Sequence, residues 1–271
     1  MIAIASSNRH RHASHTRALA WRVIRDPAAA GARNMALDHA LATCLQGDEG
    51  VLRLYAWERP TVSFGRNEPT AGLYSIPRAE ALGVDYVRRP TGGRAVLHDR
   101  EVTYSVVAPI RALGGARAAY RSINEALAAA LASLGASVAL AEDAGPTALD
   151  AGPCFQSPAG GEVVADGNKL VGSAQARIGG ALLQHGSIML AGDQSILGEL
   201  CGSEHDHPSP ATLSSLVDVV RATDVIEAVA GQMEASFRGD WSQAGYDGLE
   251  VAEADRLESE RYTQDSWTWR R

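Results

Sequence analysis

The chain has 271 residues, 45% of them hydrophobic and 21% charged, which are the proportions of a globular protein and exclude a disordered one. Its 25 basic and 32 acidic residues give a net charge of −7, which argues against a nucleic-acid partner. No apolar stretch approaches the roughly 20 residues that span a bilayer, so no membrane partner is expected either.

The basic residues are unevenly divided, because 24 of the 25 are arginines and only Lys169 is a lysine. A soluble protein of this length ordinarily carries on the order of fifteen lysines. A general preference for arginine accounts for the shortage, and chance could account for the exception. The alternative is that position 169 needs an amine, which can lose a proton where a guanidinium cannot.

The three cysteines, Cys44, Cys154 and Cys201, show neither a disulfide framework nor the spacing of metal ligands. We therefore expect a reducing compartment, the cytoplasm, and no metal site. The first 25 residues contain arginines and histidines but no acid, a composition also found in organelle transit peptides. A solvated tail is favoured here, so the expected organisation is a flexible basic extension over 1–28 and one catalytic domain over 29–271.

Apolar periodicity and turn residues predict the elements in chain order. They are a helix over 33–45, strands over 51–57 and 61–64, a helix over 77–82, a strand over 85–89, a strand pair over 95–98 and 102–108, a helix over 116–134, a hairpin of 162–165 with 169–177, a strand over 181–190, and helices near 194–201, 224–237 and 250–262. Strands come mostly in adjacent pairs. The fold class expected is therefore α+β, with a mixed, largely antiparallel central sheet flanked by helices.

The segment RRPTGGRAVLHD, over 88–99, is the densest in residues that suit a ligand. A Gly-Gly turn lets backbone N–H groups approach a bound molecule, and arginines around it suit phosphate or carboxylate. The arginines are Arg88, Arg89 and Arg94. A plain turn between strands is the alternative, since the spacing matches neither a P-loop nor a dinucleotide fingerprint.

Two later strands also carry polar residues. In DGNKLVGSAQAR (166–177), alternation along one strand would point Lys169, Ser173 and Gln175 the same way, toward a cleft or toward solvent. In LLQHGSIML (182–190), a His-Gly pair inside an apolar strand suggests a close approach of backbones.

Cys154 lies in a polar loop as Gly-Pro-Cys-Phe, whereas the other two cysteines fall in helical patterns. A loop cysteine can be incidental. A nucleophilic cysteine needs a nearby cation or base to become a thiolate, and Lys169 could supply that help.

The chain resembles the lipoate-protein ligase and octanoyltransferase family, whose catalytic domain is related to that of biotin ligases. The resemblance covers about residues 30–268, and it rests on NMALDHAL (34–41), LRLYAWERPTVSFGR (52–66), RRPTGGRAVLHDREVTYSV (88–106), PCF (153–155), DGNKLVGSAQAR (166–177), LLQHGSIML (182–190) and ERYTQDSW (260–267). It is strongest toward the single-domain octanoyl-carrier-protein:protein octanoyltransferases that have a loop cysteine. The further C-terminal domain of two-domain lipoate ligases is not expected here.

The resemblance implies a reaction in which Cys154 takes an octanoyl group from acyl carrier protein as a thioester. The group then passes to a lysine of a lipoyl-accepting protein, such as the glycine-cleavage H protein or the E2 subunit of a 2-oxoacid dehydrogenase. Lys169 matches the family's active-site lysine, whose ammonium favours the thiolate and holds the thioester oxygen. The implied acyl- and substrate-binding residues are Arg89, Thr91, Gly92, Gly93, Arg94, Ala95, His98, Gly172, Ser173, Ala174, Gln175, His185 and Gly186.

The transferase reaction implies no cofactor. An ATP-dependent lipoate-protein ligase acting through lipoyl-AMP would need ATP and Mg²⁺, and an octanoyl or lipoyl amidotransferase is a related alternative. A non-catalytic lipoate-binding module is disfavoured, because binding an acyl chain needs neither Cys154 nor Lys169. Docking of acidic carrier proteins would use the arginines of the Gly-Gly segment or of the N-terminus.

Overall fold

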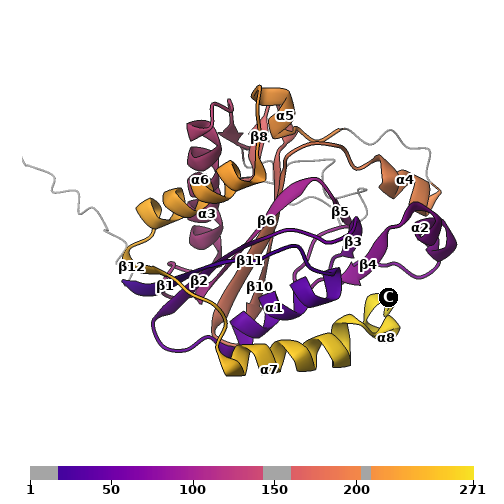
Figure 1. Cartoon of the computed structure of the whole chain (residues 1–271), viewed down its shortest axis with the longest axis horizontal. Coiled ribbons are helices and arrows are strands. Elements are labelled where there is room, and N and C mark those ends of the chain that lie inside the picture. The colour runs from indigo at the N-terminus through magenta and orange to yellow at the C-terminus, as the bar shows by residue number, and fades with distance from the viewer. Residues whose placement is uncertain (1–17, 143–159, 203–208) are drawn as a thin grey trace, which may run out of the picture.

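The computed structural model of the chain describes residues 18–142, 160–202 and 209–271 (Figure 1). Its centre is a six-stranded sheet in the order β10-β11-β6-β2-β1-β12. The strands are β1 (Leu19–Arg25), β2 (Glu49–Tyr55), β6 (Glu101–Pro109), β10 (Val171–Ile178), β11 (Ala181–Met189) and β12 (Gly239–Gln243). The pairs β10/β11, β11/β6 and β6/β2 are antiparallel, whereas β1 runs parallel to both of its neighbours. The expected α+β class with a mixed sheet is confirmed.

Strand β1 corrects the predicted extension over 1–28, because residues 19–25 belong to the central sheet. Leu19, Trp21 and Val23 alternate into the core, and the Trp21 ring stacks on Trp241 with centroids 4.7 Å apart. The arginines of this segment suggested a solvated tail, because they interrupt the apolar residues that alternate with period two along the strand. Residues 1–17 lie outside the described ranges.

Helices cover both faces of the central sheet (Figure 1). On one face α3 (Ala116–Ser133) and α6 (Ala222–Ser236) pack in the largest core cluster, together with Leu52, Leu54 and Val106 of the sheet. On the other face lie α1 (Gly31–Cys44) and α7 (Gly248–Leu257), which continues as a π-helical turn, η1 (Glu258–Tyr262), and then α8 (Asp265–Thr268). No helix in the described ranges is long and apolar enough to cross a membrane.

A second sheet has β3 (Thr61–Phe64) between β4 (Asp85–Arg88) and β5 (Val96–His98), and it packs near α2 (Ile76–Leu82) and α4 (Ser195–Cys201). The predicted pairing of the strands near 95–98 and 102–108 is wrong, since β5 pairs with β3. The reason is that β6 has no free edge, because β2 and β11 occupy both of its sides.

A third, small sheet joins β7 (Ala139–Leu140), β8 (Val163–Ala165) and β9 (Asn168–Lys169), and a short helix α5 (Leu213–Leu216) follows later in the chain. The predicted hairpin exists, with a two-residue turn at Asp166 and Gly167, whose φ angles are 48° and 77°. Positive φ at both positions is the turn that suits twisted strands. The strand is interrupted at Leu170, so β9 and β10 belong to different sheets.

Candidate active site

A cavity lies between the N-terminal half of α1, the central sheet and the second sheet, with about 390 Å³ of space free of protein atoms when the open solvent at its mouth is included. It is lined by Met35, Tyr55, Trp57, Ser63, Arg89, Val96, His98, Thr103, Gly172, Ser173, Ala174, His185, Gly186 and Ser187. These residues come from eight separate parts of the chain. The three-dimensional fold alone brings them together.

The room in this cavity comes from small residues on strand β10. In the register of β10 with β11, Ala174 lies opposite His185 and Gly172 opposite Ser187. Directly opposite residues share a face, so the side of β10 toward the cavity carries only a hydrogen and a methyl group at these positions. Gly186 is itself crowded, because a Cβ there would lie 2.4 Å from the carbonyl oxygen of Gly172. The predicted close backbone approach at the His-Gly pair is confirmed.

The hydroxyl of Ser173 and the amide of Gln175 point the same way, as predicted, and this direction is toward α3 rather than into the cavity. Ser173 Oγ donates to Asn124 Oδ1 of α3 at 3.0 Å, and Gln175 Nε2 donates to the Ala116 carbonyl at 3.1 Å. The break at Leu170 places Lys169 and β10 in different sheets.

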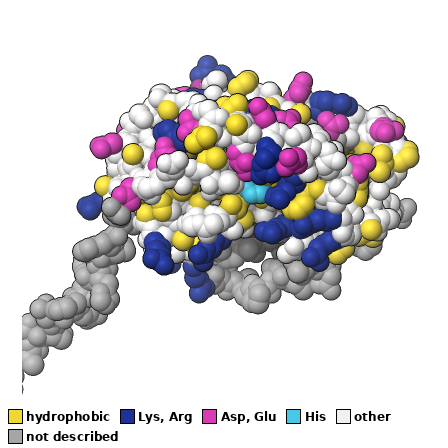
Figure 2. Space-filling model, turned by 90° about the horizontal axis from the view of Figure 1, so that it is seen from below, with side chains coloured by type: hydrophobic (Ala, Val, Ile, Leu, Met, Phe, Trp, Pro, Cys, Tyr) yellow, Lys and Arg dark blue, Asp and Glu magenta, His cyan; other side chains and the backbone are white. Residues whose placement is uncertain are grey.

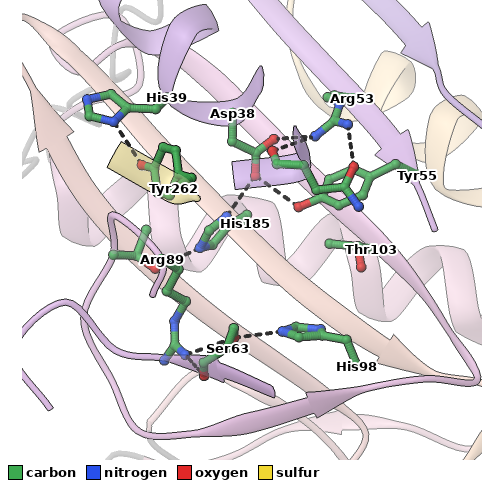
Figure 3. A network of polar contacts seen from close by, with 12 residues as sticks. Asp38, His39, Arg53, Tyr55, Ser63, Arg89, His98, Thr103, His185 and Tyr262 are labelled. Atoms are coloured by element: carbon green, nitrogen blue, oxygen red, sulfur yellow. Dashed lines mark hydrogen bonds and ion pairs between the residues drawn. The ribbon is translucent and has the colours of Figure 1, made fainter. Parts of the chain in front are cut away.

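His98 is held by hydrogen bonds at both ring nitrogens (Figure 3). Its Nδ1 lies 2.9 Å from Glu101 Oε1, and its Nε2 lies 2.7 Å from Ser63 Oγ. Its ring stacks on Trp57 with centroids 4.0 Å apart. A carboxylate only accepts, so Nδ1 carries the proton and Nε2 accepts from the Ser63 hydroxyl.

His185 is held in the same way by the first helix and the Gly-Gly turn (Figure 3). Its Nδ1 donates to Asp38 Oδ2 at 2.8 Å, and its Nε2 lies 2.7 Å from Thr91 Oγ1. Asp38 also accepts from Arg53 Nη1 and from the Tyr55 hydroxyl, each at 2.9 Å. With both nitrogens occupied, each histidine shapes the wall and leaves mainly carbon surface toward the cavity.

These networks determine the ionisation of their members. Burial acts to raise the pKa of Asp38, but the hydrogen bond from His185 and the charge of Arg53 outweigh it, so that pKa lies below its ordinary value. Burial likewise acts to raise the pKa of Glu101, but the His98 ring and the hydroxyls of Ser187 and Thr103 outweigh it, so that pKa also lies below its ordinary value. Burial lowers the pKa of His185, which keeps this imidazole neutral near pH 7.

Arg88 and Arg89 are buried and use their donors to hold the backbone around the Gly-Gly turn. Arg88 donates to the carbonyls of Gly65 and Glu68, and Arg89 donates to the carbonyls of Ser63 and Gly92. These bonds engage both guanidinium groups with the protein's own backbone, and the expected binding of an anion by Arg88 and Arg89 stays a prediction. Desolvation of a guanidinium requires many acceptors, and here backbone carbonyls supply them.

Lys169 does not line the cavity described above. It is buried in β9, and its Nζ lies 2.7 Å from Oε1 of the buried Glu162, the residue before β8. Tyr120 of α3 donates to the same carboxylate oxygen at 3.3 Å. Cys154, the predicted nucleophile, lies outside the described residues.

Seven of the predicted binding residues line the cavity: Arg89, His98, Gly172, Ser173, Ala174, His185 and Gly186. The others that were predicted do not: Thr91, Gly92, Gly93, Arg94, Ala95 and Gln175. Thr91 nevertheless touches His185, and the carbonyl of Gly92 accepts from Arg89.

Sequence reasoning missed the remaining lining residues: Met35, Tyr55, Trp57, Ser63, Val96, Thr103 and Ser187. Period-two spacing could have found two of them. Ser187 is two residues from His185 on β11, and Thr103 is its register partner on β6.

His39, one helical turn after Met35, has its Nδ1 2.9 Å from the Tyr262 hydroxyl (Figure 3). Burial and the charges of Arg261 and Arg66 lower the pKa of His39 to about 4. As the pH falls, His39 therefore takes up its proton first in the unfolded chain, near the ordinary histidine pKa of about 6.5. The free energy of unfolding decreases as the pH falls from there toward 4. Between pH 7 and pH 5 this loss amounts to about 2 kcal/mol.

We expect His39→Gln to remove that part of the pH dependence. Urea unfolding at pH 7 and pH 5 gives the change in the free energy of unfolding between these pH values for each protein. The change in the unsubstituted protein minus the change in the variant is the contribution of His39. His185 remains in both proteins, so its own contribution cancels. An equal loss of stability in the two proteins would contradict the assignment.

The fold is that of lipoate ligases. Lipoate-protein ligase A bound with ATP matches with a TM-score of 0.79 at 22% identity, over 93% of this chain and 99% of the other. A second match is the bi-partite lipoate protein ligase of the archaeon Thermoplasma acidophilum, described together with its E2 lipoyl domain. It has a TM-score of 0.74 at 22% identity, over 93% of this chain and 96% of the other.

Residues 30–238 match the lipoyl protein ligase A/B catalytic domain, and the chain belongs to this family. It is 34% identical to the octanoyltransferase LipM of Symbiobacterium thermophilum, over 93% of this chain and 98% of that protein. It is 43% identical to the octanoyltransferase LipM of Kyrpidia tusciae, over 65% of this chain and 68% of that one.

Proposed function

We propose that this protein is an octanoyltransferase of protein lipoylation, which moves an octanoyl group from acyl carrier protein through a Cys154 thioester to a lysine of a lipoyl domain. One observation supports it above the others. A cavity with a largely carbon surface opens on the small-residue face of β10, in a chain whose full-length relatives are octanoyltransferases.

The cavity suits a saturated acyl chain. The polar groups of its histidines, Glu101 and Asp38 already hydrogen-bond to one another and so do not require a polar ligand. Each buried methylene contributes about 0.8 kcal/mol to binding. Gly172 and Ala174 leave the space for such a chain.

The proposed reaction has two acyl transfers. The Cys154 thiolate attacks the carbonyl carbon of the donor thioester, and a new bond forms between that carbon and the Cys154 sulfur. The bond from the same carbon to the donor sulfur breaks, and the donor leaves as a thiol with the proton that Cys154 gave up. The neutral acceptor amine then attacks the carbonyl carbon of the enzyme thioester, the amide bond forms as the carbon–sulfur bond breaks, and the amine's proton passes to the departing Cys154 sulfur. Lys169, held by Glu162, supplies the positive charge that stabilises the thiolate and the developing oxyanion.

The thioester is already activated, so this reaction uses no cofactor. ATP and Mg²⁺ would enter only for a ligase that forms lipoyl-AMP. The acceptor is a lipoyl domain, of the glycine-cleavage H protein or of an E2 subunit. A free thiol at Cys154 suits a reducing compartment, for which we propose the cytoplasm.

Incubation with octanoyl-carrier protein, followed by intact mass measurement, tests this proposal. We expect one octanoyl adduct that hydroxylamine removes, as it does a thioester, and that Cys154→Ala abolishes. Cys44→Ala and Cys201→Ala are matched controls that retain the adduct. The lone lysine simplifies the result, because Lys169 and the N-terminus are the only amines and Lys169 is buried.

An adduct that survives Cys154→Ala would refute the transfer through this thiol. Pyrophosphate release from ATP that depends on lipoate and is unaffected by Cys154→Ala would instead identify a ligase.

A further inference from the structure

Glu68 is a half-buried carboxylate that joins two loops next to β3 and β5. Over the surface of the molecule, acidic side chains lie among cationic ones (Figure 2). Glu68 instead bonds to the backbone on two sides. Its Oε2 accepts from the Gly65 N–H at 2.8 Å, and its Oε1 accepts from the Ala95 N–H at 2.9 Å. One carboxylate therefore links the turn that follows β3, over residues 65–68, to the segment that precedes β5.

The two hydrogen bonds of Glu68 differ in reach. The bond to Gly65 closes a local turn, as a glutamate three residues after a helix N-cap does. The bond to Ala95 spans 27 positions of the chain, so no local turn requires it. Burial raises the pKa of Glu68, and the charge of Arg89 with the two N–H groups only partly offsets this effect. A carboxyl pKa that folding raises lowers stability at neutral pH, which favours a role in geometry.

The turn over residues 65–68 is fixed in the fold and lies directly against the Gly-Gly turn. Arg88 Nη1 donates to the carbonyls of Gly65 and Glu68, at 2.6 and 2.8 Å. A Cβ on Gly65 would lie 1.7 Å from the carbonyl oxygen of Gly93, so the two backbones are in close contact. The position of one turn therefore sets the position of the other.

The Gly-Gly turn in its place supports three residues that line the acyl cavity. The Arg66 N–H donates to the Thr91 carbonyl at 2.8 Å, and the Thr91 hydroxyl lies 2.7 Å from His185 Nε2. Arg89 and Val96 flank the turn on its two sides, and both line the cavity together with His185. Val96 directly follows the residue whose N–H is held by the carboxylate.

We propose that Glu68 is a positioning residue for acyl binding, which holds the Gly-Gly turn where Arg89, Val96 and His185 fit the octanoyl chain. This inference rests on the proposed function. Glu68 acts through the wall, since it is not among the described residues that line the cavity, and Lys169 lies in the third sheet. Loss of its hydrogen bonds should therefore weaken binding of the acyl chain and leave the chemical step unchanged.

Two thioester donors of different length separate acyl binding from the chemical step: octanoyl-pantetheine and butanoyl-pantetheine. Each buried methylene favours binding about fourfold, so the unsubstituted protein should prefer the octanoyl donor on the order of 100-fold in kcat/KM for formation of the enzyme thioester. In Glu68→Gln this ratio should fall at least about tenfold, mainly through a higher KM for the octanoyl donor. A glutamine keeps one acceptor oxygen but turns an NH₂ group toward the other backbone N–H.

Glu250→Gln is the matched control. Glu250 also accepts from a backbone N–H three residues before it, that of Asp247 at 2.9 Å, and it pairs with Arg22 in a buried position on α7. This variant should lose at least as much stability as Glu68→Gln, and it should keep the donor ratio of the unsubstituted protein.

Gly65→Ala tests the same wall by a second route, and it decides the question if Glu68→Gln does not fold. The added Cβ would press on the Gly93 carbonyl oxygen and displace the Gly-Gly turn, while the Glu68 carboxylate remains. We expect the donor ratio to fall in this variant too.

An unchanged donor ratio in Glu68→Gln, or an equal loss for the two donors, would overturn the inference and leave the proposed function intact. A ratio that falls as far in Glu250→Gln would also overturn it, because the ratio would then follow stability. Failure of both donors to form a thioester at Cys154 of the unsubstituted protein would overturn the proposed function, and this inference with it.

Discussion

Lys169→Met is expected to slow octanoyl transfer to Cys154 by about 100- to 1,000-fold, the usual effect of removing one preorganised electrostatic donor. Lys169→Arg should show most of the same loss. The ammonium lies 2.7 Å from Glu162 in a buried site, and a larger planar guanidinium cannot occupy that position with the same geometry. Single-turnover formation of the enzyme thioester measures the effect directly. A Lys169→Arg protein within tenfold of the unsubstituted rate would contradict it.

A loss of structure has to be separated from a loss of catalysis in this test. Removing Lys169 leaves the Glu162 carboxylate buried without the ammonium that lies 2.7 Å from it, which costs about 3–5 kcal/mol of stability. In Lys169→Met/Glu162→Gln the charge is gone as well, so stability should largely return while the rate stays low. If the double variant recovers the rate together with the stability, then the role of Lys169 is structural.

Asp38→Ala is expected to lower the free energy of unfolding by about 3–5 kcal/mol. The carboxylate is fully buried and takes part in hydrogen bonds or ion pairs with Arg53, Tyr55 and His185. Its removal leaves the buried Arg53 guanidinium with only Asp26 as a paired carboxylate among the residues that the structure describes. Urea unfolding at pH 7 measures the change.

Asp255→Ala is the matched control, because Asp255 also pairs with an arginine, Arg33, but on an exposed part of the surface. Exposed pairs contribute at most about 1 kcal/mol, so this variant should unfold almost as the unsubstituted protein does. The pKa of Asp38 is lowered in the fold, so its contribution is present above the unfolded pKa of about 3.9 and is lost as the pH falls through it. Equal effects of the two substitutions would contradict the buried network.

Most elements could be read from local patterns, because their signals are local. The helix that ends at Gly83 does so with φ 68° at that residue, and the hairpin turn has two positive φ angles at Asp166 and Gly167. The same patterns located the Gly-Gly segment and both histidines. Strand β1 escaped notice, because arginines interrupt its apolar alternation.

The candidate site was less accessible to sequence reasoning, because its contacts join distant residues. Asp38 and His185 are 147 positions apart, and Trp57 and Thr103 are 46 apart. Nothing in the alternation of DGNKLVGSAQAR reveals that the strand breaks at Leu170. Nor does the density of arginines near the Gly-Gly turn show that Arg88 and Arg89 donate to backbone carbonyls.

By itself the sequence determined the family, through a single lysine, a loop cysteine, two histidines and a Gly-Gly turn in a set order, and it predicted that these residues carry the chemistry. Each of these residue types reports a requirement of its own position, such as an amine group or a positive φ angle, which does not depend on distant residues. The tertiary structure decided which of them face the cavity, which arginines are neutralised, and where Lys169 finds its carboxylate. Those properties depend on strand register and burial, which arise only when distant segments pack together.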